Sequence, residues 1–179
     1  MLHDPRLDPP VMSADRFDLR PLRASDAGLI EFYTSDDRVA RATTSIPHPL
    51  PPGATEAFVD RVLDAARTEF VWVMDGIKTG GPEVMGVISL DQIDVGQCEI
   101  SYWVAPAYWN SGVASAAVST LIAANPLNCR TLFATVFQDN AASARVLTNS
   151  GFQYLGDAET FNVARNAKVA TWTYSRKMD

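Results

Sequence analysis

The stretch from Cys98 to Ala124 reads CEISYWVAPAYWNSGVASAAVSTLIAA, and the rest of the chain can be interpreted around it. Its first part, Cys98 to Val104, is apolar and rich in β-branched and aromatic residues, which predicts a largely buried strand that stops at Pro106. Its last part, Ala116 to Ala124, consists of small and apolar residues, as in a helix that packs closely on a sheet. We therefore predict a strand, a short turn and a helix.

The predicted turn is a candidate anion site. The first N–H groups of a helix lack partners within the helix, and the helix dipole favours negative charge there, so this turn is suited to a phosphate. Gly112 allows a ligand to approach the backbone, and Ala114 leaves the next position uncrowded. The same small residues could equally form only a face that lets helix and sheet pack closely, and a Gly-x-Ala pattern alone has little specificity.

The composition indicates one folded domain. The chain has 179 residues, of which 47% are hydrophobic and 20% charged, enough for a sizeable core. We expect residues 1–15, which contain three prolines, to form a loosely held N-terminal arm, and residues 16–179 to form the domain.

Charge and hydropathy limit the expected partners and location. The net charge is −6 and no run of Lys or Arg occurs, which argues against a nucleic-acid partner. The sequence shows neither a signal segment nor an apolar run of membrane length, so we expect no membrane association and a cytoplasmic location. With only two histidines, we expect no metal site. Cys98 and Cys129 are predicted to be buried thiols rather than a disulfide.

Hydrophobic periodicity and turn residues predict the remaining elements. Asn140 is expected to cap a helix that Gly151 ends, and Ser25 to cap an earlier helix. We predict strands at 16–22, 69–74, 83–93, 98–104, 131–137, 152–155 and 167–176, helices near 25–32, 35–42, 54–67, 116–124 and 141–149, and loops at 43–53 and 156–166. The predicted fold class is α+β, with a mostly antiparallel sheet of about six or seven strands and helices on both faces. An edge strand at 167–174 could pair with a second copy, which makes a homodimer possible.

Three segments in this order resemble the GNAT N-acetyltransferase superfamily: Glu99 to Pro106, Tyr108 to Ser115, and Asn140 through Ser143 to Phe152. The likeness extends over Arg16 to Lys177 and is greatest to the RimJ/RimL-type group, which acetylates ribosomal-protein N-termini and related amines. Three ordered motifs are more specific than one. The resemblance implies the GNAT fold, in which a splayed central strand pair binds acetyl-CoA, and direct acetyl transfer, without a metal, to a primary amine of a protein N-terminus or a small molecule.

The resemblance also implies the cosubstrate-binding residues. The family's pyrophosphate turn matches at Gly112 and Ala114, so main-chain N–H groups of this turn would hold the diphosphate of acetyl-CoA, and the main chain of the preceding strand would bind pantetheine. Two positions depart from the RimJ/RimL-type pattern, because this group usually has Gly at the position of Asn110 and Glu at the position of Ala116. The expected binding residues are Trp103, Val104, Ala105, Asn110, Ser111, Gly112, Val113, Ala114, Ser115, Asn140 and Ser143.

Two residues are candidates for proton transfer. Glu99 matches a Glu common in similar enzymes and could remove a proton from the amine; alternatively, it is a strand carboxylate that pairs with a Lys or Arg or bonds to a loop. Many relatives carry a Tyr at the position of Leu147 to protonate the leaving thiolate, so Ser143 is the nearest substitute. Alternatively, Asn140 and Ser143 could only cap the N-terminus of the helix. His48 lies in a loop that could face the acceptor amine.

Two other function classes stay open. The chain could bind and sense acyl-CoA without catalysis, since fold and site can separate, or it could be a structural interaction domain. Residues 38–52 and 156–166 are expected to form the walls of the acceptor site.

Overall fold

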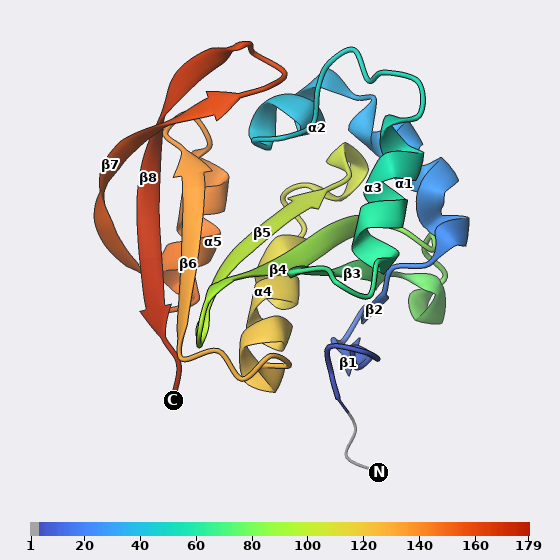
Figure 1. Cartoon of the computed structure of the whole chain (residues 1–179), viewed down its shortest axis with the longest axis horizontal. Coiled ribbons are helices and arrows are strands. Elements are labelled where there is room, and N and C mark those ends of the chain that lie inside the picture. The colour runs from blue at the N-terminus through green and yellow to red at the C-terminus, as the bar shows by residue number, and fades with distance from the viewer. Residues whose placement is uncertain (1–3) are drawn as a thin grey trace.

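The computed structural model describes residues 4–179, and these form one eight-stranded sheet in the order β1-β2-β3-β4-β5-β6-β8-β7 (Figure 1). All neighbouring strands are antiparallel except β5 and β6. The α+β class and the mostly antiparallel sheet predicted from the sequence are confirmed.

The elements follow the predicted order. The strands are β1 (Met12–Ser13), β2 (Asp18–Pro21), β3 (Glu69–Asp75), β4 (Gly86–Asp94), β5 (Gln97–Val104), β6 (Thr131–Phe137), β7 (Gln153–Asn162) and β8 (Ala167–Lys177). The helices are α1 (Ala27–Thr34), α2 (Asp37–Ala42), α3 (Ala54–Leu63), α4 (Val113–Ala124) and α5 (Ala141–Asn149), with short 3-10 turns η1 (Ala24–Asp26), η2 (Ile77–Thr79) and η3 (Pro106–Tyr108).

The parallel pair β5 and β6 is joined over a short distance only. Gln97, Cys98 and Glu99 pair with Thr131, Leu132 and Phe133, and beyond Glu99 the two strands diverge. β5 continues beside β4, whereas β6 continues beside β8. Figure 1 shows the resulting V between β5 and β6. The splayed strand pair implied by the resemblance is therefore present.

Two hydrophobic clusters lie on opposite faces of the sheet. Buried residues of α4 and α5, such as Leu121 and Leu147, pack with Ile100 and Val104 of β5. On the other face, Ile30 of α1 and residues of α3 pack with β3 and β4, and Trp103 joins them. Because side chains alternate along a strand, β5 contributes to both faces and separates the space under α1–α3 from the space under α4 and α5.

The prediction of free cysteines is wrong, because Cys98 and Cys129 form a disulfide across 31 residues of sequence. Parallel pairing of β5 with β6 brings the start of β6 beside Cys98, and the Cα atoms of the two cysteines are 6.3 Å apart, within the range that a disulfide spans. The bond fastens β5 to β6 at the narrow end of the V. Nothing local in the sequence indicated this proximity.

The N-terminal arm is attached more firmly than expected. Residues 1–3 lie outside the described part, but Met12 is buried and pairs with Leu19 of β2. The indole N–H of Trp72 donates to the Pro10 carbonyl at 3.0 Å. Part of the segment predicted to be loose therefore belongs to the sheet and the core.

The C-terminal half of the sheet differs from the prediction at one strand. Residues 156–162, predicted as part of a polar loop, extend β7, which pairs with β8 down to a register of Asn162 with Ala167. β7 is mostly exposed, so its sequence lacks the alternation that marks a half-buried strand. The expected edge strand is also wrong, because β8 lies between β6 and β7 and the edge strand is β7.

Several helix starts and ends differ from the predicted ones; α4, for example, begins at Val113 and not at Ala116. Asn140 caps α5 as expected, since its side chain accepts from the Ser143 N–H, and Gly151 follows the helix with a φ of 85°. α1 begins at Ala27 after a 3-10 turn, and the Asp26 carboxylate, not Ser25, accepts from the Arg23 N–H at 2.8 Å. α3 ends at Leu63, four residues before the predicted Arg67.

Candidate active site

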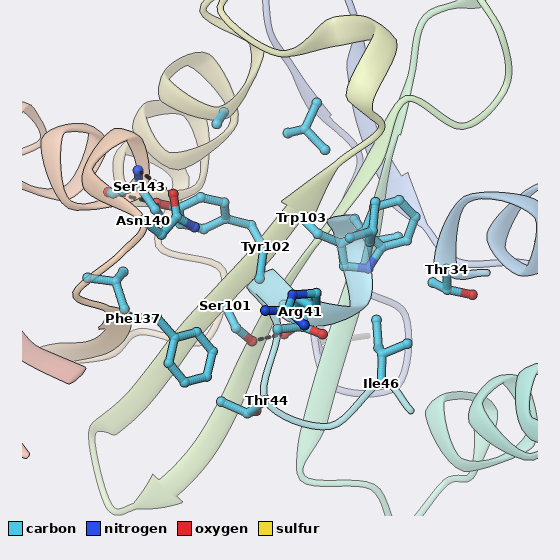
Figure 2. Close-up of a pocket in the computed structure, with 18 of the residues that line it drawn as sticks. Thr34, Arg41, Thr44, Ile46, Ser101, Tyr102, Trp103, Phe137, Asn140 and Ser143 are labelled. Carbon is cyan, nitrogen blue, oxygen red and sulfur yellow. Dashed lines mark hydrogen bonds between the residues drawn. The ribbon is translucent and has the colours of Figure 1, made fainter. Parts of the chain in front are cut away.

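A cleft of about 1070 Å³ opens where β5 and β6 diverge (Figure 2). Its lining includes residues 99–104 of β5, the turn before α4, residues of α5, most of the segment 37–50 and residues 134–137 of β6, together with residues of α1, α3, β3, β4 and the β7–β8 hairpin. Figure 2 shows Asn140 and Ser143 close to Tyr102 on one side, and Arg41, Thr44 and Ile46 on the other. The cleft thus brings together segments far apart in sequence.

The turn before α4 has the conformation expected of an anion site. Gly112 is the N-cap with a φ of 79°, and no side chain caps this end of the helix within the described residues. The first bond into the helix runs from the Ala116 N–H to the Gly112 carbonyl at 3.0 Å, so the N–H groups of Val113, Ala114 and Ser115 lack helical partners. Three main-chain donors are therefore available at one place.

Asn110 has a φ of 58°, in the left-handed region. Asn is the residue that adopts this conformation most readily after Gly. The departure from the glycine usual in the RimJ/RimL-type group therefore preserves the shape of the turn.

Two arginines, one beside this turn and one elsewhere in the cleft lining, were not predicted from the sequence. Arg16 donates to the Ser111 carbonyl, and its guanidinium lies 3.5 Å from where a Cβ on Gly112 would stand. Arg145 of α5 lines the cleft. Arg16 lies far from the turn in sequence, and no local pattern marks it as a site residue. Arg145 follows Ser143 by two residues on a cleft-lining helix, and this position could have marked it as one.

The main chain of β5 faces the cleft at alternate residues. The Ala105 N–H donates to the Met85 carbonyl at 2.8 Å, so this residue and every second one before it point toward β4. Tyr102 and Val104 consequently direct their main-chain groups toward the side from which β6 has diverged. The Val104 carbonyl accepts from the indole N–H of Trp109 at 2.7 Å, which leaves the Val104 N–H facing the cleft.

Two of the expected binding residues lie outside the cleft lining. Ala105 is fully buried with its N–H engaged, and neither it nor Ser111 is part of the cleft lining. The Ser111 hydroxyl donates to the Tyr108 carbonyl. Tyr102, which the sequence analysis left out, has the exposed main chain instead.

Tyr102 also contacts Ser143 through its side chain. The phenol oxygen lies 2.8 Å from the Ser143 hydroxyl and 3.2 Å from the Ser143 carbonyl, to which it donates. Burial raises the pKa of Tyr102 to about 12, against a lowering by the Ser143 hydrogen bond. The phenol is therefore protonated at neutral pH and orients the Ser143 hydroxyl.

Comparison with known protein families identifies the family of this chain. The family model of the acetyltransferase (GNAT) domain matches its residues 16–153. The chain belongs to the GNAT acetyltransferase family. It is also 27% identical over 175 residues to the uncharacterized N-acetyltransferase YoaA of Bacillus subtilis (strain 168), covering 93% of this chain and 96% of that protein.

Solved structures share the GNAT fold. Mycobacterium smegmatis RimJ, in complex with CoA-disulfide, aligns with a TM-score of 0.79 at 18% identity, over 94% of this chain and 88% of its own. Spermidine N-acetyltransferase from Vibrio cholerae, in complex with CoA and spermine, aligns with a TM-score of 0.76 at 15% identity, over 91% and 96%. The resemblance to GNAT and RimJ-type proteins proposed from the sequence is confirmed at the level of family and fold.

Glu99 of this GNAT chain lies on the face opposite Tyr102. It lines the cleft and stands in a row of carboxylates across three strands, because Glu69 pairs with Asp91 and Asp91 with Glu99. Partial burial raises the pKa of the Glu99 carboxyl, and Asp91 raises it further. No Lys or Arg bond to Glu99 is present in the described chain, so the ion-paired alternative is not supported.

The expected acceptor walls are only partly found. Most of the segment 38–52 borders the cleft, whereas of residues 156–166 only Arg165 does. His48 lies outside the lining, with its Nε2 atom 4.0 Å from the Asp37 carboxylate.

Residues 4–179 contain no group of three His, Cys, Asp or Glu side chains placed to hold a metal. None of their helices has the length and apolarity needed to span a membrane.

Proposed function

We propose that this GNAT protein transfers the acetyl group of acetyl-CoA directly to a primary amine. The observation that carries the proposal is that one cleft contains the unpaired N–H groups at Gly112, the outward-facing main chain of Tyr102 and Val104, and the Glu99 carboxyl. A long ligand bound at the turn and along β5 would therefore reach toward a carboxyl that can accept a proton.

The turn fits the diphosphate of acetyl-CoA. Main-chain N–H groups at a helix start bind phosphate without requiring a basic side chain, and Arg16 adds a positive charge beside the turn. Arg145 on α5 supplies a second cation in the cleft lining. Pantetheine would lie in the V, where the Tyr102 and Val104 main chain replaces the strand partner that β6 no longer provides.

The reaction requires three tasks, and the chain offers a group for each. Glu99 accepts a proton from the attacking amine, since its raised pKa makes it a better base than an ordinary carboxylate. The Val104 N–H polarises the thioester carbonyl. When the Tyr102 O–H donates to the Ser143 hydroxyl oxygen across their 2.8 Å contact, the Ser143 hydroxyl can donate a hydrogen bond to the sulfur as the C–S bond breaks and the N–C bond forms. The amine side and the sulfur side would lie on opposite faces of β5.

The acceptor class is a primary amine, of a protein N-terminus or of a small molecule. The carboxylate row formed by Glu69, Asp91 and Glu99 and the net charge of −6 favour amines that arrive protonated. The name of one structural relative, spermidine N-acetyltransferase, refers to a small-molecule amine acceptor.

A thiol-release assay tests this proposal. Purified protein is incubated with acetyl-CoA and a panel of linear amines and N-terminal peptides, and free CoA is measured, while calorimetry measures acetyl-CoA binding. We expect saturable binding of acetyl-CoA and release of free CoA that depends on the acceptor amine. Binding without turnover for any amine would indicate a CoA sensor, and no binding would indicate a structural domain; either result would reject the proposed enzyme.

A further inference from the structure

The tip of the β7–β8 hairpin is bonded to the segment that follows α2. The Asn162 side-chain N–H₂ donates to the Arg41 carbonyl at 2.9 Å and to the Thr43 carbonyl at 3.1 Å. The Val163 N–H donates to the Thr44 carbonyl at 3.1 Å. We refer to residues 162–165 together with residues 41–44 as the hairpin bridge.

Asn162 is the centre of the hairpin bridge. It is fully buried, both of its amide hydrogens are used, and its side-chain oxygen accepts from the Arg165 N–H at 3.0 Å. Only a side-chain amide provides two donors and an acceptor at one position in this way. An aspartate of the same size would place a carboxylate against the Arg41 and Thr43 carbonyl oxygens.

Arg165 connects the hairpin bridge to the end of β6. Its guanidinium donates to the Arg41 carbonyl at 2.9 Å and to the Asp139 carboxylate at 2.5 and 3.2 Å. It also lies 5.1 Å from the centre of the Phe137 ring. The Arg165 hydrogen bond lowers the pKa of Asp139, so this pair is charged at neutral pH.

The hairpin bridge closes the wide end of the V. β5 and β6 diverge from the pair Glu99 and Phe133, and the β7–β8 tip reaches α2 on the far side of the opening (Figure 1). Arg41, Thr43, Thr44 and Arg165 all line the cleft, so the bridge forms part of its wall. In the view of Figure 2, Arg41 and Thr44 are drawn next to Ser101 of β5, which is two residues from Glu99 in the sequence.

We propose that Asn162 is a positioning residue that determines acceptor specificity. By fixing residues 41–44 across the cleft, it sets the shape of the wall that an amine meets on its way to Glu99. The inference rests on the proposed function. It concerns only the acceptor, because the hydrogen bonds that hold the bridge in the described chain do not involve the turn at Gly112.

Asn162→Asp tests the proposal, with Asn166→Asp as the matched control. Asn166 is an exposed residue of the same hairpin whose side chain makes no bond to residues 41–44. For Asn162→Asp we expect the KM of a linear amine to rise about tenfold, as for the loss of one or two hydrogen bonds, with kcat and the KM of acetyl-CoA within about twofold of wild type. The ratio of kcat/KM for a branched amine to that for its linear isomer should rise. The control should match wild type.

A second variant and a structural measurement keep the test decisive. If Asn162→Asp does not fold, Arg165→Gln removes the bond to Arg41 while Asn162 remains, and the same change in acceptor KM is expected. Hydrogen exchange of the Val163 amide should become faster in either variant. Unchanged acceptor KM and branched-to-linear ratio in an active variant, or a parallel loss of kcat and acetyl-CoA affinity, would overturn the role of Asn162. A wild-type protein that acetylates no amine would instead overturn the proposed function, and this inference with it.

Discussion

Glu99 pairs with Phe133 in the last register pair between β5 and β6, so it stands at the point where the two strands separate. The Cys98–Cys129 disulfide fastens the strands directly beside it. The candidate base therefore lies at the fixed end of the V, while the opposite end is held by the hairpin bridge. Both ends of the cleft are constrained by bonds between segments distant in sequence.

Replacing Glu99 with Gln should slow turnover without weakening acetyl-CoA binding. The amide keeps the size of the side chain but cannot accept the proton, and loss of a general base costs about 10²- to 10⁴-fold in kcat. Because burial raises the pKa of Glu99, kcat/KM of the wild type should fall when the pH drops below a pKa that is higher than that of an ordinary Glu. The variant should lack this acidic limb of the pH–rate profile.

The pH–rate profile from the thiol-release assay measures this effect, with Glu159→Gln on the exposed face of β7 as the control. A Glu99→Gln variant with wild-type kcat and the same acidic limb would exclude Glu99 as the base.

Gly112→Ala should weaken acetyl-CoA binding by about tenfold. A side chain at a φ of 79° costs about 1–2 kcal/mol, and relief of that strain would turn the N–H groups of Val113 and Ala114 away from a common point. Asn110→Gly is the matched substitution, because position 110 also has positive φ but glycine adopts it freely, so affinity should be retained. Calorimetric titration with acetyl-CoA compares the two, and equal losses in both would argue against a special role of Gly112.

Ser143→Ala should lower kcat, whereas Tyr102→Phe should lower it less. Ser143 is the group proposed to contact the sulfur, and Tyr102 acts by orienting it across 2.8 Å. A neutral hydrogen bond contributes about 0.5–1.5 kcal/mol, so we expect a decrease of about three- to tenfold for Ser143→Ala. Single-turnover kinetics with a good acceptor separate this step from product release. A Tyr102→Phe variant much slower than Ser143→Ala would make the tyrosine, not the serine, the proton donor.

Local patterns explain which parts of the fold were predicted. β6 was predicted with its observed bounds because Thr131 to Phe137 carries both β propensity and clear breaks at either side. The Asn140 cap was found for the same reason, since a cap depends on neighbours within one turn. β7 was missed because an exposed edge strand has no buried face to create alternation.

The site was predicted where a motif was continuous in sequence. Gly112 and its neighbours form one turn, and their conformation follows from local residue types. Arg16 and Asn162, by contrast, act through contacts with residues about 100 positions away, and nothing in their own surroundings marks them. Whether the main chain of Ala105 or of Tyr102 faces the cleft depends on which strand partner each N–H faces, and this is a property of the register.

Arg20→Met should destabilise the fold by about 3–5 kcal/mol, as expected when one partner of a buried ion pair is removed. The Arg20 guanidinium donates to both oxygens of Asp26 at 2.9 and 2.8 Å and to Asp75 at 2.7 Å, and Asp26 is 1% exposed. In the variant, the buried Asp26 carboxylate would lose both hydrogen bonds from Arg20 and would keep the one from the Arg23 N–H. These hydrogen bonds raise the pKa of Arg20, so the stability that this shift contributes is fully present below the ordinary pKa of arginine and is lost only as the pH rises above it. Arg38→Met, which breaks an exposed pair with Asp36, should change stability by less than about 1 kcal/mol. Urea unfolding measures both variants, and similar midpoints for the two would show that the buried network does not hold β2 to the start of α1.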